Sequence, residues 1–175
     1  MKPFEPVLNF YLNMIIRNAS IADLPTIVSI YNSIIPGRMV TADIEPVTVE
    51  DRTAWFLSHT PTRPIWIFED ENNAIIGWAS FKNFYGRPAY SGTAEFSMYL
   101  DENFRSKGYG LQILNYAIQQ SPALQLHTLL GFIFEQNTPS IILFKKAGFE
   151  EWGHLPDVAI LDEKSCSLKI LGRKV

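Results

Sequence analysis

The chain has 175 residues, of which 47% are hydrophobic, and this length and composition suit one domain with a substantial core. Its 15 basic and 18 acidic side chains give a formal net charge of -3 without any basic block, which argues against nucleic acid as a partner. The only cysteine, Cys166, cannot form an intrachain disulfide, so a reducing, cytoplasmic compartment is expected.

The first residues are apolar in places, but Pro3, Glu5 and Pro6 interrupt them, and no signal peptide is predicted. No later run approaches the roughly 20 apolar residues of a membrane span, so no membrane partner is expected. Met14 is a second possible start of translation. We expect residues 1–13 to be an N-terminal extension and residues 14–175 to form a single domain.

Helix caps and hydrophobic periodicity define the first half of the chain. Ser20 is a suitable N-cap for a first helix, and Thr48 for a second helix with Trp55, Phe56 and Leu57 on its buried side. Residues 38–46 are a loop or an edge element with some β character. The expected elements are strands over 15–17, 65–68 and 74–81, the last two forming a hairpin, and helices over 21–33 and from 49 to before Pro61.

The second half continues the alternation of strands and helices. Residues 129–134 form a near-continuous apolar run, which is typical of a central strand covered by helices. The remaining expected elements are strands over 93–100, around 150–153, over 157–161 and over 167–171, and helices over 108–120 and from 137 to Gly148. The order β-α-α-β-β-β-α-β-α-β-β predicts one α/β or α+β domain.

The stretch from residue 93 to residue 114 carries the clearest functional signal. Its strand alternates apolar and polar residues, so Glu95 points away from the apolar face. The loop that follows, R-S-K-G-Y-G over residues 105–110, leads directly into a helix. Backbone N–H groups, a helix N-terminus and two cations meet there, which predicts a phosphate site. The glycines have neither the dinucleotide-binding register nor the G-K-[ST] of a P-loop.

This loop resembles the Q/R-x-x-G-x-G/A motif of the GCN5-related N-acetyltransferase (GNAT) superfamily. Further segments are similar to the phosphinothricin acetyltransferase family, and the similarity runs from about Ile15 to the C-terminus. These segments are IYNSII (30–35), WASF (78–81), GRPAY (86–90), AEFSMYL (94–100), NTPSIILFKKAGF (137–149) and GHLPDVAILD (153–162). The resemblance implies the GNAT fold, a mixed and mostly antiparallel sheet with helices on both faces.

The resemblance also implies acetyl-CoA as the co-substrate. The loop and helix N-terminus would hold its pyrophosphate, and a gap beside the strand ending at Leu100 would take its pantetheine arm like an added strand. One backbone N–H there would stabilise the oxyanion of the attacked thioester. The implied cofactor-binding residues are Met98, Tyr99, Leu100, Arg105, Ser106, Lys107, Gly108, Tyr109, Gly110, Asn137 and Ser140.

Glu95 is the candidate general base, because the acceptor's ammonium group must lose a proton before it attacks. Arg87 and Tyr90, in the loop before the strand, are the candidate substrate contacts, with Arg87 suited to a carboxylate. Without the resemblance, Glu95 reads as a solvent-facing strand residue and the other two as ordinary loop residues. The implied reaction is direct acetylation of a primary amine on a small amino-acid-like molecule, of the phosphinothricin or methionine sulfoximine or sulfone type.

One departure from the family concerns the helix after Asn137, where Phe144 replaces a histidine of the family's S-x-x-L-H phrase. Any acid–base role of that histidine is absent, which puts efficient acetylation of the family's named substrate in doubt. Tyr99 and Tyr109 are alternative proton donors. Two other functions stay open: acetylation of a protein N-terminus, polyamine or aminoglycoside, and non-catalytic CoA binding.

The three histidines, His59, His127 and His154, lie on different elements without carboxylates or cysteines at ligand spacing, so no metal is expected. The resemblance further implies a homodimer.

Overall fold

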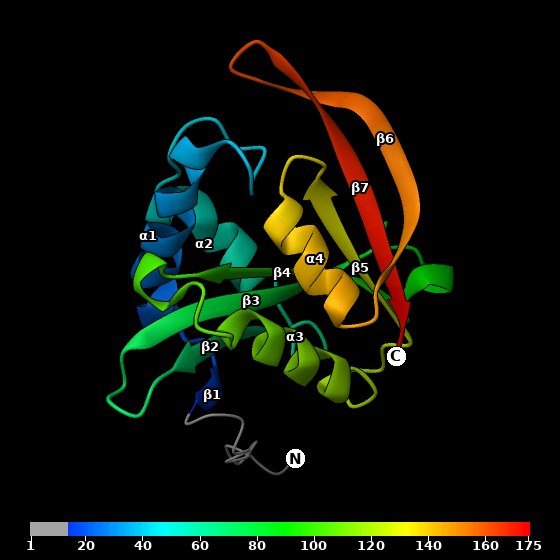
Figure 1. Cartoon of the computed structure of the whole chain (residues 1–175). Helices are drawn as coiled ribbons and strands as arrows, with labels where there is room; N and C mark the ends of the chain where they lie inside the picture. The colour runs from blue at the N-terminus through cyan, green and yellow to red at the C-terminus, as the bar shows by residue number, and fades with distance from the viewer. Residues whose placement is uncertain (1–13) are drawn as a thin grey trace.

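A seven-stranded sheet forms the centre of the protein. In the computed structural model, which describes residues 14–175, the strands follow the order β1-β2-β3-β4-β5-β7-β6 (Figure 1). Every neighbouring pair is antiparallel except β4 and β5, which are parallel. The strands are β1 (Ile15–Asn18), β2 (Ile65–Glu69), β3 (Ile75–Asn83), β4 (Thr93–Leu100), β5 (Thr128–Phe134), β6 (Glu150–Leu161) and β7 (Lys164–Lys174).

Helices cover both faces of the sheet. On one face, α1 (Leu24–Ile34) and α2 (Val49–Leu57) pack over an apolar cluster that includes Trp78. On the other face, α3 (Tyr109–Gln120) and α4 (Thr138–Lys146) cover the larger cluster, which includes Phe96 (Figure 1). Successive side chains of a strand point to opposite faces of the sheet. Neighbouring residues of β3 or β4 therefore face different pairs of helices.

The predicted order of strands and helices is confirmed, including the hairpin of β2 and β3 and the central place of β5. The first helix begins differently from the prediction. Ile21–Asp23 form a 3-10 turn before α1, and a proline occupies the first turn of α1. Asp23 holds the start of this turn, because its Oδ2 accepts hydrogen bonds from the backbone N–H and the hydroxyl of Ser20.

Two expectations about side chains and strands were wrong. Leu57 does not lie on the buried side of α2, since it is 68% exposed, whereas Trp55 and Phe56 pack against the smaller cluster. Three consecutive residues span about 200° of a helix, so they cannot all share one narrow face. The segments 150–153 and 157–161 are one strand, β6, whose pairing with β7 shifts register between Leu155 and Ala159.

The segment between α1 and α2 forms no strand in the described structure, and it links separate parts of the fold. Arg38 Nε donates to Asp162 Oδ2 at 2.8 Å, which joins this segment to the tip of the β6–β7 hairpin. The hairpin extends beyond the helices at one end of the molecule (Figure 1). The segment is therefore tied at its start to the β6–β7 hairpin.

Candidate active site

The parallel strands β4 and β5 diverge in the middle of the sheet. Their pairing covers three residue pairs and ends where Glu95 lies opposite Leu130. Beyond that point the strands enclose a cavity lined from β4 by Phe96 and Met98 and from β5 by Gly131 and Ile133. Unpaired backbone on the edge of a strand can accept an extended ligand as an additional strand. The predicted gap beside β4 is thus present as a feature of the fold.

A larger cleft of about 520 Å³ adjoins this gap, and the glycine loop forms one of its walls. Arg105, Ser106 and Gly108 line it ahead of α3. Gly108 is the N-cap of α3 and has a φ of +86°, a backbone conformation that favours glycine. The first N–H groups of α3 have no partner within the helix, so they provide an anion site at the cleft.

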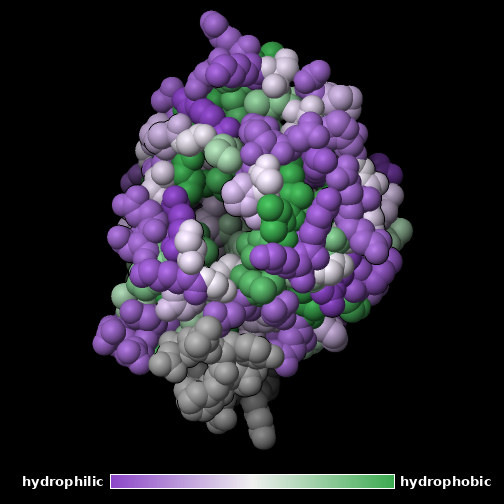
Figure 2. Space-filling model, viewed as in Figure 1, coloured by the Kyte–Doolittle hydropathy of each residue, from purple (hydrophilic) through white to green (hydrophobic). Residues whose placement is uncertain are grey.

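Gly110 allows a close approach between the helices at this cleft. A Cβ on Gly110 would lie 3.1 Å from Leu143 Cδ2 of α4, tighter than an ordinary contact. Figure 2 shows the hollow on this face, with hydrophobic side chains along its rim. A cleft with apolar walls, a helix N-terminus and an arginine at one end suits a long cofactor with an apolar arm and a phosphate group.

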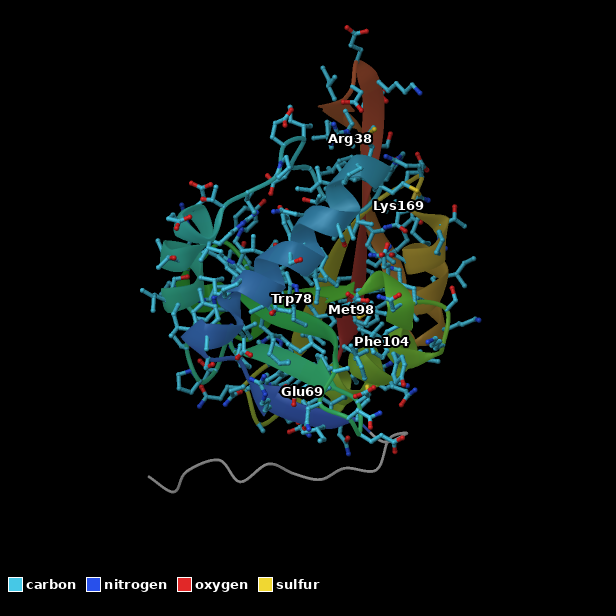
Figure 3. The ribbon with its side chains drawn as sticks, turned by 90° about the vertical axis from the view of Figure 1, so that its left-hand side faces the viewer. Arg38, Glu69, Trp78, Met98, Phe104 and Lys169 are labelled. Carbon is cyan, nitrogen blue, oxygen red and sulfur yellow. The ribbon has the colours of Figure 1, made fainter. Side chains whose placement is uncertain are left out.

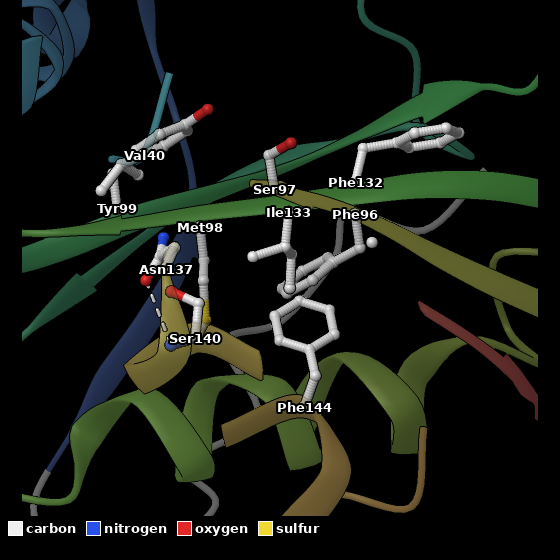
Figure 4. A pocket seen from close by; sticks show the side chains of 11 residues that line it. Val40, Phe96, Ser97, Met98, Tyr99, Phe132, Ile133, Asn137, Ser140 and Phe144 are labelled. Atoms are coloured by element: carbon white, nitrogen blue, oxygen red, sulfur yellow. Dashed lines mark hydrogen bonds between the residues drawn. The ribbon is translucent and has the colours of Figure 1, made fainter. Parts of the chain in front are cut away.

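The floor of the gap is closed by α4 (Figure 4). Asn137 caps this helix, because its Oδ1 accepts a hydrogen bond from the Ser140 backbone N–H at 3.2 Å. Phe144 is buried, and its ring centroid lies 4.8 Å from that of Phe149. The position of the missing histidine is therefore part of the apolar core.

A second cavity, of about 390 Å³, lies on the opposite face of the same strands, under α1 and α2. Its floor consists of three cross-strand pairs between β3 and β4, with Glu95 as one member of the first pair. These pairs are Lys82 with Glu95, Ser80 with Ser97, and Trp78 with Tyr99. A carboxylate and an ammonium group therefore stand side by side at one end of the cavity, and aromatic rings lie at the other.

A polar network from α1, α2 and the segment between them forms the wall of this cavity. Asp43 Oδ2 accepts hydrogen bonds from Tyr31 Oη at 2.6 Å and from Arg52 Nη2 at 2.6 Å, and Tyr31 also bonds Thr41. The Arg52 guanidinium lies over the Tyr31 ring, 4.7 Å from its centroid. Hydrogen bonds and ring stacking together hold this cation at the cavity wall.

Tyr99 lines the cavities on both faces. Figure 4 shows the Tyr99 and Ser97 side chains on one side of β4 and those of Met98 and Phe96 on the other. Burial raises the pKa of Tyr99 well above its usual value. Its hydroxyl is therefore a weaker acid than that of an exposed tyrosine and stays protonated at neutral pH.

Most of the predicted cofactor residues come together around the gap and the cleft. Lys107 and Tyr109 are the exceptions, since neither lines these cavities; Lys107 Nζ lies 5.5 Å from the centroid of the Phe104 ring instead. The predicted residues that line them are Met98, Tyr99, Leu100, Arg105, Ser106, Gly108, Gly110, Asn137 and Ser140. Glu95 lines the second cavity, as its position in the strand predicted.

Arg87 and Tyr90 lie away from the cavity that holds Glu95. They belong to an exposed turn before β4, where Tyr90 packs edge-on against Phe84 at 5.4 Å between ring centroids. The cations that do line the cavity, Arg52 and Lys82, were not predicted from the sequence. The position of Lys82 opposite Glu95 follows from the register of β3 and β4, whereas that of Arg52 depends on how α2 packs.

The two cavities meet across one strand, which is the arrangement that a group transfer between two ligands requires. A donor held in the gap and an acceptor held under α1 would meet at the backbone of β4, with the Glu95 carboxylate lining the acceptor's side. This geometry defines an N-acyltransferase that uses an acyl-CoA. Residues 27–149 match the model of the Acetyltransferase (GNAT) family, and the chain belongs to this family.

Relatives agree with this assignment. The chain is 52% identical over 162 residues to the "Putative phosphinothricin acetyltransferase YwnH" of Bacillus subtilis (strain 168), covering 93% of this chain and 99% of that protein. It is 34% identical to the L-methionine sulfoximine/L-methionine sulfone acetyltransferase of Pseudomonas aeruginosa PAO1, covering 82% of this chain and 84% of the relative.

A solved structure shows the same fold with a bound cofactor. The GNAT superfamily phosphinothricin acetyltransferase from Sinorhizobium meliloti in complex with AcCoA matches with a TM-score of 0.87 and 26% identity, over 94% of this chain and 89% of that one. The protein described here is accordingly an acetyl-CoA-dependent N-acetyltransferase.

The part of the chain from residue 14 to residue 175 contains no group of three or more His, Cys, Asp or Glu side chains that could hold a metal ion. None of its helices is long and apolar enough to cross a membrane.

Proposed function

We propose that this enzyme acetylates the primary amine of a small amino-acid-like molecule, of the phosphinothricin or methionine sulfoximine or sulfone type. The observation that carries the proposal is the cavity under α1 and α2, where Glu95 and two cations surround a space for a small zwitterion. Acceptors of this type appear in the names of the relatives given above, a putative phosphinothricin acetyltransferase and an L-methionine sulfoximine/L-methionine sulfone acetyltransferase. A cavity of about 390 Å³ is too small for a folded protein and suits a single amino acid.

In this proposal, Glu95 accepts the proton that the acceptor's ammonium group must lose, directly or through one water. The free amine then attacks the thioester carbonyl of acetyl-CoA, and a backbone N–H at Met98 to Leu100 donates to the oxygen on which negative charge develops. The CoA thiolate is a good leaving group near neutral pH. No covalent enzyme intermediate is needed, since the amine is itself the nucleophile.

The proposed binding groups for the acceptor's carboxylate are Arg52 and Lys82. Arg52 presents a planar fork of donors at the cavity wall, and its single hydrogen bond to Asp43 leaves further N–H groups for a ligand. Arg87 and Tyr90 stay predicted substrate contacts on the strength of the family resemblance alone. The proposed cofactor contacts are those predicted from the sequence, including Lys107 and Tyr109 on the loop.

Tyr99 is the proposed proton donor to the leaving thiolate. It lines the cavities on both faces of β4 and carries a hydroxyl, which Phe144 lacks. Phe144 cannot take this role, because a phenyl ring has no exchangeable proton.

An acceptor screen that detects the released thiol tests the proposal. We expect turnover with phosphinothricin, methionine sulfoximine or methionine sulfone, and we expect Glu95→Gln to lower kcat about 100-fold without changing the Kd of acetyl-CoA. Glu163→Gln is the matched control and should leave kcat unchanged, since it makes the same substitution at an exposed carboxylate between β6 and β7, outside the cavities. Preferred turnover of polyamines, aminoglycosides or peptides would replace the proposed acceptor, and acetyl-CoA binding without any turnover would support a non-catalytic role.

We also propose that the enzyme is a homodimer that pairs through the outer face of β6. Four apolar side chains on this edge strand are exposed, namely Trp152, Leu155, Val158 and Ile160. Exposed apolar edge strands promote association unless they are covered. Val158→Lys with Ile160→Lys should halve the mass measured by sedimentation equilibrium, whereas Ile142→Lys, at an exposed apolar residue of α4, should leave it unchanged.

The proposed compartment is the cytoplasm, and the proposed unit is a single domain over residues 14–175. The one cysteine is reduced and buried, which suits a reducing compartment. The extension predicted for residues 1–13 lies outside the described residues.

A further inference from the structure

The cleft beside the glycine loop carries two positive charges and no negative charge. Within the part of the chain that the structure describes, the charged side chains that line it are Arg105 of the loop and Lys146 in the last turn of α4. The cleft lies on the side of the sheet that holds Met98 and Phe104, away from Trp78 (Figure 3). An excess of positive charge in a cleft indicates an anionic ligand.

Lys146 lies on the face of α4 that lines the cleft. Pro139, Ser140 and Leu143 of the same helix line the cleft as well. Lys146 follows Leu143 by three residues, a spacing that places two side chains on one face of a helix. Lys146 is exposed, and it has no ion-pair partner among residues 14–175. Its ammonium group is therefore accessible to a ligand in the cleft.

The neighbouring Lys145 faces a different direction. Adjacent side chains of an α-helix are about 100° apart, and Lys145 does not line the cleft. The pKa of Glu151 in β6 is lowered chiefly by its hydrogen bond from Lys169 and further by the charge of Lys145. Both lysines at the end of α4 suit the negative end of the helix dipole, so that effect does not distinguish them. Only the position at the cleft sets Lys146 apart.

Lys146 lies at the end of the cleft that is remote from the gap between β4 and β5. Met98, Tyr99 and Ser140 line both the gap and the cleft, so the two spaces join at these residues. Lys146 lines the cleft alone, as Arg105 does, and it follows Ser140 by six residues, or about 9 Å along α4. Lys146 therefore shares the end of the cleft that holds the predicted phosphate site.

Acetyl-CoA carries two separate phosphate groups at the end opposite its thioester. One is the pyrophosphate within the chain, which suits the N-terminus of α3 and Arg105. The other is a phosphate monoester on the 3′ oxygen of the ribose, and the ribose separates it from the pyrophosphate. A phosphate monoester carries close to two negative charges at neutral pH. It therefore needs a cation of its own, and a lysine ammonium group is a compact charge that binds phosphate.

We propose that Lys146 binds the 3′-phosphate of acetyl-CoA. This assigns a cofactor contact outside the loop motif, on the helix at the other wall of the cleft. It concerns the cofactor alone, so it holds whichever amine is the acceptor. The residue would let the enzyme distinguish coenzyme A from its 3′-dephospho form, which has the same thiol arm and pyrophosphate.

The test compares the binding of coenzyme A and 3′-dephospho-coenzyme A by calorimetric titration, without an acceptor. We expect the wild type to bind coenzyme A about 10-fold more tightly, because one additional charged contact forms. Lys146→Gln should reduce this preference to less than about twofold by weakening coenzyme A alone. Lys145→Gln is the matched control, since it removes the adjacent charge of the same helix, and it should keep the wild-type preference.

Two further measurements sharpen the test. The preference of the wild type should decline between 50 mM and 500 mM salt, because added ions screen a contact between exposed charges. Lys146→Arg keeps the positive charge and should keep most of the preference. In steady-state kinetics, Lys146→Gln should raise KM for acetyl-CoA about 10-fold and leave kcat unchanged, since the 3′-phosphate is remote from the reacting thioester.

Three outcomes would overturn the proposal. The first is a Lys146→Gln variant that still prefers coenzyme A as the wild type does, and the second is an equal loss of affinity for both compounds. The third is a preference that disappears in Arg105→Gln but persists in Lys146→Gln, which would place the 3′-phosphate at the loop. Because Lys146 is exposed, the variant should unfold at the wild-type temperature.

Discussion

The ring of Phe144 lies directly against the backbone of Gly131. A Cβ on Gly131 would be 2.5 Å from Phe144 Cε1, a distance that real Cβ atoms do not reach. The phenyl ring of α4 thus fills the space that the absent side chain of β5 leaves at the floor of the cofactor gap. The loss of the family's histidine is accompanied here by close packing between helix and strand.

Gly131→Ala should destabilise the protein by about 1–3 kcal/mol, because the added methyl group overpacks a closed core. Chemical denaturation with a single cooperative transition measures the change. Phe144→Leu in the same chain should restore part of the loss by removing ring atoms. Gly37→Ala is the control, since nothing lies within 4 Å of a Cβ there, and a large loss in that variant would contradict the explanation.

Gly108→Trp should abolish acetyl-CoA binding, because the indole would project into the cleft beside the N-terminus of α3. Gly108 has a φ of +86°, so any side chain also strains the cap by about 1 kcal/mol. Gly86→Trp is a matched control with a φ of +62° in an exposed turn outside the cleft. Isothermal titration should show wild-type affinity for Gly86→Trp; retained affinity in Gly108→Trp would remove the loop from the cofactor site.

Arg52→Gln should raise KM for an amino-acid acceptor about 10-fold by removing the donors proposed to bind the carboxylate. The corresponding amino-acid amide, which has no carboxylate, should be affected less than about twofold. Steady-state kinetics with each acceptor measure the two KM values. Arg87→Gln provides the comparison between the cation that lines the cavity and the one predicted from the sequence. A selective loss in Arg87→Gln alone would transfer the carboxylate site to that residue.

The acid stability of the fold should depend on Asp23. Hydrogen bonds from the Arg17 guanidinium, at 2.8 Å, lower the pKa of Asp23 from 3.8 to about 2. The folded state thus binds this proton less readily than the unfolded state. The stabilisation is complete above about pH 4 and is lost as the pH falls towards 2.

Asp23→Asn should therefore reduce the stability at pH 7 by about 1 kcal/mol after allowance for solvent screening, and it should flatten the decline between pH 4 and 2. Urea unfolding across this pH range measures both effects. Asp157→Asn, at an exposed carboxylate in the β6 strand, should leave the profile unchanged. An identical acid slope in Asp23→Asn and the wild type would exclude the Arg17 pair as its source.

Local patterns were reliable where short-range chemistry decides the structure. Glu95 was assigned to its face correctly, because alternation along a strand depends only on neighbouring residues. Leu57 shows the limit of this approach: an apolar residue at the end of a short helix was expected to be buried, but no element covers it. The two segments of β6 were likewise read as separate strands, because a proline and a bulge interrupt the pattern of one continuous strand.

The sequence by itself determined the order of the elements, the glycine loop before α3 and the family, because caps, periodicity and motif spacing are local properties of the chain. Only the tertiary structure decided what surrounds Glu95. Arg52 and Asp43 are far from Glu95 in the chain and reach the same cavity only when α1 and α2 pack on the sheet. Trp78 is likewise buried only in the tertiary structure, because the rings around it come from three other elements.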